Sequence, residues 1–406
     1  NDEGNITLPL PFKNEDPIFP DNSAAVRLRT HNTLKRLLRD KEKLTKCIVA
    51  MKKNIDANHV EVVPRSDIHL NNGKEWYIPV FGVFHPRKDK ARLVFDSSAK
   101  FKNVSLNGCL YQGPDFNNRL RTVLLRFRLN DVGFSADICS MFYCFYLEEK
   151  DKNFSKFFWF KDNDPTEELI EYRARVHLFG NTSSPALAIL GLRFAIDNDT
   201  EETSNEVKDY VRNHFYVDDG LKSTKTPEEA TKILQDTRNA LSKFNIKLHQ
   251  ICSNVKEVTN SFPVSERGGE KESITNSEST STLGIKWDTS KDLLVIKTNV
   301  PFHKFTRRGI LAAVNSTFDP LGFIAPIILQ GKLIQRKLLS TPSADGETYG
   351  WDDPLPKEHE LEWNDWTRSM KSATGLAIPR CYRPSGHGRG GRCAALRHCA
   401  SWKGLA

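Results

Sequence analysis

The chain carries two adjacent aspartates inside a short apolar segment, His214-Phe215-Tyr216-Val217-Asp218-Asp219-Gly220-Leu221. An Asp-Gly step between β-forming residues predicts a hairpin, because glycine accepts the positive φ that tight hairpin turns need. Two neighbouring carboxylates at a hairpin tip repel each other and raise each other's pKa unless a cation lies between them. The segment therefore indicates a site for a divalent metal ion, with an exposed turn of no functional role as the alternative.

The length of 406 residues allows two or three domains with buried cores. The longest apolar run, Leu321 to Leu329, is too short to cross a bilayer and contains Gly322 and Pro326, so we expect no membrane partner. The first residues include neither Met nor a secretory leader, and cysteines up to residue 252 lack paired spacing. These features predict an intracellular piece of a larger protein.

The net charge of +8 is concentrated near the C-terminus. Residues 380 to 406 contain six Lys or Arg residues and no Asp or Glu, so the rest of the chain has little excess charge. Overall charge therefore says little about nucleic-acid binding.

The first part of the chain predicts a basic helix and then a hairpin. Residues 1–65 are interpreted as an extended lead-in followed by a helix from Asp21 or Asn22 to about Ile55. Residues 76–84 and 92–96 predict two strands joined by a cationic turn. This turn is a solvated loop on one interpretation. On the other, its cations hold a triphosphate or a nucleic-acid backbone; these are Arg87, Lys88, Lys90 and Arg92.

A further carboxylate, Asp137, lies in the apolar segment Phe134-Ser135-Ala136-Asp137-Ile138, which predicts a strand. An aspartate inside such a segment is costly unless it is paired or bound to metal, although it could instead cap the next helix. Ser184-Pro185 predicts the start of a helix that runs to about Ala195. Thr226-Pro227-Glu228-Glu229 predicts a capping box at the start of another.

The alternation of these elements predicts an α+β fold in residues 66–264. Residues 265–282 are rich in Ser, Thr, Glu and Gly and are interpreted as a linker. Residues 283–380 predict a smaller α+β unit: strands at 283–287 and 293–296, helices at 304–314 and 327–339, and a Trp-rich segment that packs back onto them. Residues 381–406 lack acidic groups and are interpreted as an unmatched, out-of-frame tail.

Taken in order, several segments resemble the reverse transcriptase of BEL/Pao long-terminal-repeat retrotransposons. They are Arg92 to Ser98, Val104 to Asn107, Ala136 to Ile138, Phe179-Gly180 with Ser184-Pro185, His214 to Leu221, and Phe318 to Gly322. The resemblance covers nearly all of residues 1–380 and implies a right-hand polymerase with fingers, palm and thumb, followed by a connection-like unit that is sometimes labelled a peptidase. It also implies a retroelement polyprotein, located in cytoplasmic particles with access to the nucleus, in which RNase H and integrase follow.

The resemblance implies RNA-directed DNA synthesis, in which two Mg²⁺ ions, with Mn²⁺ as a substitute, promote transfer of a dNTP to a primer on an RNA or DNA template. The implied metal ligands and catalytic residues are Asp137, Asp218 and Asp219. The implied nucleotide-binding residues are Lys90, Arg92, Phe142, Phe179, Gly180 and Tyr216. Phe142 matches the aromatic residue that excludes a ribose 2′-hydroxyl, which favours a DNA product.

Two alternatives remain open from sequence. One is a truncated, inactive remnant that at most binds nucleic acid, and it is favoured by the missing start and by the tail. Gln250 is a separate departure from the family pattern, which leads us to expect Lys there. The other is an aspartic peptidase, which uses Asp-Thr/Ser-Gly loops. The nearest segment, Asp288-Thr289-Ser290, lacks the glycine.

Overall fold

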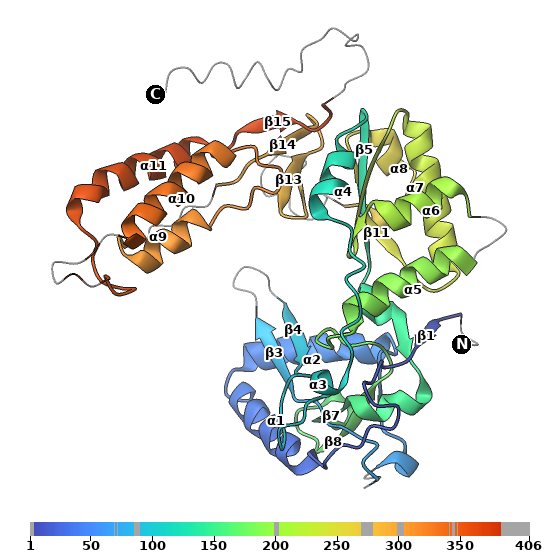
Figure 1. Cartoon of the computed structure of the whole chain (residues 1–406). Coiled ribbons are helices and arrows are strands. Elements are labelled where there is room, and N and C mark those ends of the chain that lie inside the picture. Colours follow the sequence, from blue (N-terminus) through green and yellow to red (C-terminus); the bar gives the residue numbers. More distant parts are fainter. Residues whose placement is uncertain are drawn as a thin grey trace. The chain divides into compact units, whose positions relative to one another are not determined.

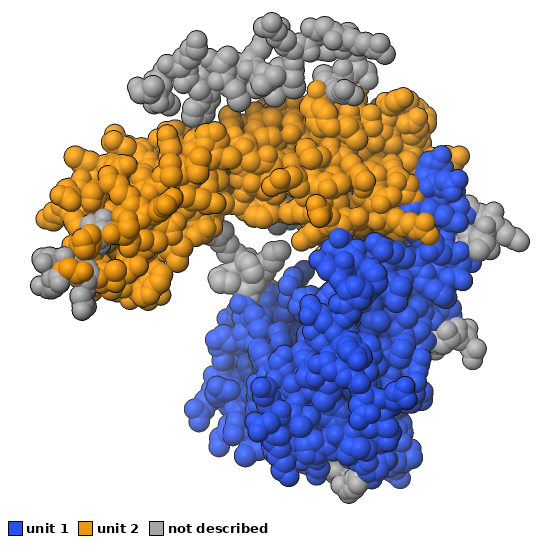
Figure 2. Space-filling view, in the orientation of Figure 1, with its two compact units in different colours: residues 1–117, 138–208, 236–247 blue, residues 118–137, 209–235, 248–406 orange. Residues whose placement is uncertain are grey.

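A computed structural model describes residues 4–68, 70, 72–84, 90–198, 203–268, 279–298, 304–340, 342, 346 and 348–382. The chain forms two compact units (Figures 1 and 2). Unit 1 contains residues 1–117, 138–208 and 236–247, and unit 2 contains residues 118–137, 209–235 and 248–406. Each unit is therefore built from segments that are far apart in sequence. The domain boundaries predicted from sequence at residues 65, 264, 282 and 380 remain predictions.

Unit 1 combines small sheets with long helices. Its strands are β1 (Ile6–Leu8), β2 (Val60–Val62), β3 (Val80–Phe84), β4 (Ala91–Phe95), β6 (Phe145–Leu147), β7 (Lys156–Phe160) and β8 (Leu169–Ala174). Its helices are α1 (Ser23–Leu37), α2 (Lys41–Asp56), α3 (Leu106–Cys109) and α5 (Ser184–Asn198), with 3₁₀ turns η1 (Arg65–Asp67), η2 (Met141–Cys144), η3 (Glu149–Ser155) and η4 (Lys161–Asn163). β2, β8 and β7 form one antiparallel sheet, β3 and β4 form a hairpin, and β1 pairs with β6.

The single N-terminal helix predicted to run to Ile55 is wrong, because the chain turns between α1 and α2. Asp40 begins the second helix, and its side chain accepts a hydrogen bond from the backbone N–H of Lys43 at 3.1 Å. Asn22 does not cap α1 with its side chain. It bonds instead to both backbone groups of Tyr77, at 2.8 and 3.0 Å.

Unit 2 contains two four-stranded sheets and most of the remaining helices. The first sheet has the order β11-β5-β10-β9, and the second has the order β12-β13-β14-β15. The strands are β5 (Val132–Ile138), β9 (Phe215–Tyr216), β10 (Asp219–Thr224), β11 (Leu248–Ser253), β12 (Ser279–Thr282), β13 (Ile285–Asp288), β14 (Leu293–Val295) and β15 (Ala377–Pro379). Helix α4 (Leu120–Phe127) packs on β10, while α6 (Asn205–Asn213) and α7 (Pro227–Ser242) each continue from one unit into the other.

The rest of unit 2 is mainly helical. It contains α8 (Lys256–Asn260), η5 (Val264–Glu266), α9 (Arg307–Val314), α10 (Ala325–Ser340), η6 (Lys357–His359) and α11 (Glu360–Ser372). α10 packs against both α9 and α11 (Figure 1). Trp363 and Trp366 are buried among these helices, as predicted. The side chain of Trp351 is half exposed, but its ring contacts Arg307 and Arg308 of α9, so it also packs onto these helices.

Some predicted features lie in residues that the structure does not describe. These are most of the cationic turn (85–89, with Arg87 and Lys88), linker residues 269–278, and tail residues 383–406. The last four residues of the predicted linker, 279–282, form β12 and pair with β13. Among the described residues, no helix is both long and apolar enough to span a membrane.

Candidate active site

Two aspartates face each other across the middle of the first sheet of unit 2. β5 and β10 are antiparallel, and their register places Asp219 directly opposite Asp137. Side chains opposite each other on such strands have Cβ atoms about 5 Å apart, so two carboxylates there repel. Burial of β5 on both faces explains why its sequence is mostly apolar, with the buried Ser135 and the half-buried Asp137 as exceptions.

Asp218 lies in the turn beside this pair. Tyr216 pairs with Asp219, so Val217 and Asp218 form the two-residue turn of the predicted hairpin. The prediction that Gly220 supplies the positive φ is wrong, since Val217 has a φ of 56°. A β-branched residue rarely adopts this conformation, and such local strain is common at functional sites.

Gly220 is needed for another reason. It lies in β10, where an added Cβ would come within 2.5 Å of the Phe215 ring and 2.6 Å of the Tyr210 hydroxyl. The missing side chain lets α6 and the aromatic residues pack closely against the strand next to the aspartates. Tyr216, a predicted nucleotide-binding residue, is half-buried and packs against the apolar cluster that includes Val123 and Leu221.

His249 on β11 lies next to the three aspartates, and together they form one cluster. The sequence analysis did not single out this histidine. Its Nε2 lies 3.2 Å from Oδ2 of Asp137. The residues next to His249 in the sequence do not indicate a contact with Asp137, because that contact depends on β11 pairing with β5. Gln250, where a Lys was expected, is exposed with a φ of 53°.

Crowding of the carboxylates changes their acidity. Burial, together with the charges of Asp137 and Asp218, raises the pKa of Asp219 from 3.8 to about 7. Burial and the charge of Asp137 also raise the pKa of Asp218, partly offset by a backbone hydrogen bond and by His249. Such shifts show that the cluster lacks enough positive charge of its own.

The carboxylate oxygens of the three aspartates are of the type that a hard divalent cation prefers. Oδ1 of Asp137 is buried and has no hydrogen-bond partner among the described residues, which leaves one carboxylate oxygen available. Within the same residues, no group of three or more His, Cys, Asp or Glu side chains is arranged to hold a metal ion. Mg²⁺ commonly binds to one or two carboxylates together with substrate phosphates and water, so a complete protein cage is not required.

The other predicted residues belong to unit 1. Lys90 precedes β4 and is exposed, and Arg92 is exposed on β4 opposite Val83 of β3. At the end of this hairpin, Asp96 pairs with Arg29 at 2.8 Å. The described part of the hairpin thus presents two cations to solvent.

Phe142, Phe179 and Gly180 come together within unit 1. The rings of Phe142 and Phe179 have centroids 5.3 Å apart, and Phe179 is 62% exposed. Gly180 has a φ of 132°, and an added Cβ would lie 2.6 Å from the carbonyl oxygen of Phe95 at the end of β4. Three of the predicted nucleotide-binding residues therefore form one surface beside β4, while the aspartates form another group within unit 2.

The peptidase alternative receives no support from Asp288. Its Oδ1 accepts hydrogen bonds from the backbone N–H groups of Ser290 and Lys291 and from the Ser290 hydroxyl, at 2.7 to 3.2 Å. These bonds close the turn after β13, as expected of a structural Asx turn.

The fold is similar to that of a retroviral polymerase. A solved structure of the foamy viral protease-reverse transcriptase in complex with double-stranded DNA matches with a TM-score of 0.50 and 13% sequence identity. The match covers 92% of this chain and 54% of that one, so this chain spans about half of the viral protein's length. At this identity the match establishes a shared fold. No curated protein matches the chain.

The C-terminal region has a sequence relationship of its own. Residues 306–389 match the family of Pao retrotransposon-like RNaseH-like domains, so the chain contains a retrotransposon-type region. The prediction that residues 381–406 match nothing is wrong for residues 381–389, and an RNaseH-like region was expected only further along the chain. The described part of this region contains α9, α10, η6, α11 and β15.

Proposed function

We propose that this chain is the RNA-directed DNA polymerase region of a retrotransposon polyprotein. The observation that carries the proposal is the placement of Asp137 opposite Asp219, with Asp218 in the adjoining turn. Like charges are brought together in this way where a cation is to be bound. The fold shared with a protease-reverse transcriptase supports the same assignment.

In this proposal the first sheet of unit 2 is the palm, the β3–β4 hairpin belongs to the fingers, and α9 to α11 form a thumb or connection. Asp137 and Asp218 hold Mg²⁺, and Asp219 supports them. Two bound Mg²⁺ ions would activate the primer 3′-hydroxyl and stabilise the leaving pyrophosphate. Lys90 and Arg92 bind the triphosphate, and Tyr216 supports the turn that carries Asp218.

Phe142, Phe179 and Gly180 would form the nucleotide pocket. The exposed ring of Phe179 and the ring of Phe142 give a flat apolar surface, and Gly180 allows close approach to the backbone of β4. Phe142 would exclude the 2′-hydroxyl of a ribonucleotide. Replacing it by Val should therefore increase use of rNTPs relative to dNTPs by about tenfold or more, since one steric contact in a pocket contributes about 1–3 kcal/mol.

The proposal is tested by extension of a DNA primer on an RNA template with dNTPs and Mg²⁺. The variant Asp218→Ala/Asp219→Ala should lose extension. Asp352→Ala/Asp353→Ala is the matched control, because it removes another adjacent pair of aspartates from the same unit, and Asp352 is mostly exposed. The control should extend the primer like the wild type.

A folded wild-type chain that binds primer and template but extends nothing would contradict the proposal. That result would favour the inactive remnant. Equal loss in the control pair would instead show that the chain does not tolerate loss of charge in general.

A further inference from the structure

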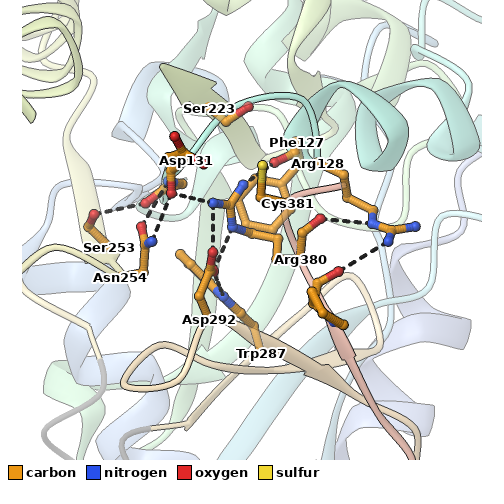
Figure 3. Close-up of polar contacts among 12 residues, drawn as sticks. Phe127, Arg128, Asp131, Ser223, Ser253, Asn254, Trp287, Asp292, Arg380 and Cys381 are labelled. Atoms are coloured by element: carbon orange, nitrogen blue, oxygen red, sulfur yellow. Dashed lines mark hydrogen bonds and ion pairs between the residues drawn. The ribbon is translucent and has the colours of Figure 1, made fainter. Parts of the chain in front are cut away.

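A buried polar cluster surrounds Arg380 (Figure 3). Arg380 follows β15, and its side chain is completely buried. Its Nε and Nη2 donate to the two carboxylate oxygens of Asp292 at 2.7 and 2.9 Å. The guanidinium also lies over the rings of Phe127 and Trp287, at 5.1 and 5.9 Å from their centroids.

The guanidinium also binds the turn between α4 and β5. Nη1 donates to the carbonyl oxygens of Phe127 and Asn130 at 2.6 and 3.0 Å, and Nη2 donates to that of Asp131 at 2.6 Å. Together with the bonds to Asp292, these contacts use all five guanidinium N–H groups. Charge-assisted bonds in a buried setting are costly to break, so the turn is held firmly in place.

The same cluster reaches the three strands of the candidate site. Gly133 of β5 passes under the guanidinium, where an added Cβ would lie 2.6 Å from Nε. The N–H of Gly133 donates to Oδ1 of Asn254 at 2.8 Å, and its carbonyl accepts from the Ser253 hydroxyl on β11 at 2.8 Å. The Ser223 hydroxyl on β10 accepts from the N–H of Asn130 at 3.1 Å.

The cluster and the aspartates occupy opposite ends of the same paired strands. On β5, Gly133 and Asp137 are four residues apart, and their partners on β10, Ser223 and Asp219, have the same separation. At about 3.3 Å per residue this corresponds to roughly 13 Å. A side chain that fixes the pairing at one end thereby fixes which residues face each other at the other end.

We propose that Arg380 is a positioning residue for the candidate active site. By joining the C-terminal segment to the α4–β5 turn, it holds β5, β10 and β11 in register and so holds Asp137 and Asp219 at a fixed separation. The effect of Arg380 on strand pairing does not depend on the proposed function, whereas its effect on catalysis rests on that function. The chain must then extend at least through Arg380 for the site to be properly formed.

Hydrogen exchange of the whole chain tests the effect on the strands. Arg380→Lys keeps the charge but has three N–H donors in place of five, so it cannot hold Asp292 and all three carbonyls together. Amide exchange in residues 134–138 and 215–221 should become faster by about tenfold or more, since these segments lose the support that limits local opening.

Met370→Ala is the matched control. Met370 is fully buried in the helical cluster of α9 to α11, so its truncation lowers the stability of the same unit without touching the sheet. Exchange is compared at temperatures where the two variants have equal global stability. The control should then leave exchange in both segments unchanged.

Primer extension gives the second readout. Arg380→Lys should lower kcat by about 10–100-fold with little change in KM for dNTP, because a misplacement of about 1 Å has effects of this size. Asp292→Asn keeps the shape of the partner and provides a milder variant if Arg380→Lys does not fold. Its effects should have the same direction.

The outcomes separate the two proposals. Unchanged exchange in both segments, in Arg380→Lys and in Asp292→Asn, would overturn the positioning role even in a chain that extends primers. Faster exchange in a chain that extends no primer would support the positioning role and reject the proposed function.

Discussion

Asp209 and Asp219 lie close together in sequence in the same unit, yet their acidities are shifted in opposite directions. Burial acts to raise the pKa of Asp209, but hydrogen bonding and charge interactions, first from Lys222, outweigh it and lower the pKa to about 2. The Nζ of Lys222 lies 2.5 Å from Oδ2 of Asp209. Asp219 is buried beside two other aspartates, and its pKa is raised to about 7.

The comparison separates a carboxylate whose charge is compensated within the chain from one whose charge is not. Asp209 has a cation from its own chain, so its charge stabilises the fold. The charge of Asp219 is opposed by burial and by its neighbours, so the ionised cluster becomes favourable only when a cation from outside arrives. This difference supports assigning function to the cluster of Asp137, Asp218 and Asp219, and not to the one around Asp209.

The largest expected effect is on activity. Asp137→Asn should reduce primer extension by about a thousandfold or more, because it removes a proposed metal ligand, and bound metal stabilises the transition state by several kcal/mol. The melting temperature should stay equal or rise, since one of three repelling charges is lost. Extension assays and thermal melts on the same preparation measure both quantities.

Asp209→Asn serves as the control for that experiment and should keep extension within about threefold of the wild type, a difference of less than about 1 kcal/mol. If Asp137→Asn retained activity, or if the two variants lost it equally, the distinction between the two clusters would fail.

The sequence predicted the local elements that carry Asp137, Asp218 and Asp219. An apolar segment predicted β5, and the Asp-Gly step between β-forming residues predicted the hairpin; the structure brings the three aspartates of these segments together. Their catalytic role remains a prediction. Turn chemistry was less reliable, because Val217 and Asp218 form the two-residue turn, so the positive φ falls on Val217 while Gly220 lies in β10.

Contacts between distant segments could not be predicted. Arg380 binds carbonyl oxygens about 250 residues earlier in the chain, and nothing in the local sequence marks a backbone carbonyl as a partner. His249 was missed for the same reason, because its contact with Asp137 follows from strand order. The break before Asp40 was missed because the apolar spacing of residues 26 to 48 continues across it.

Gly220→Ala sharpens the comparison between the Asp209 and Asp219 clusters, because it disturbs β10, the strand that carries Asp219. The added methyl group would overlap the Phe215 ring and the Tyr210 hydroxyl. We expect a loss of about 1–3 kcal/mol in the free energy of unfolding, which is typical of overpacking. Chemical denaturation measures it, with Gly375→Ala as a strained but uncrowded control, since Gly375 has a φ of 85° and no atom within 4 Å of an added Cβ. A loss no larger than in the control would show that close packing at Gly220 is unimportant.

Asp219→Asn should change the dependence of stability on pH. The folded pKa of about 7 lies above the ordinary value of 3.8, so the native state holds this proton more tightly than the unfolded state. Stability of the wild type is therefore lost as pH rises from about 4 to 7. The amide cannot ionise, so the variant should gain in melting temperature relative to the wild type across this range. Parallel curves for the two proteins would contradict the raised pKa.

The smallest effect is expected at Asp209, and its sign is opposite. The folded pKa of about 2 lies below 3.8, so the ionised group contributes stability above pH 3.8 that is lost as pH falls toward 2. The side chain is 46% exposed, which limits the contribution to about 1 kcal/mol or less through solvent screening. Asp209→Asn should thus lower the free energy of unfolding slightly at neutral pH, and less so in high salt. A gain in stability, as expected for Asp219→Asn, would show that Lys222 does not compensate the charge of Asp209.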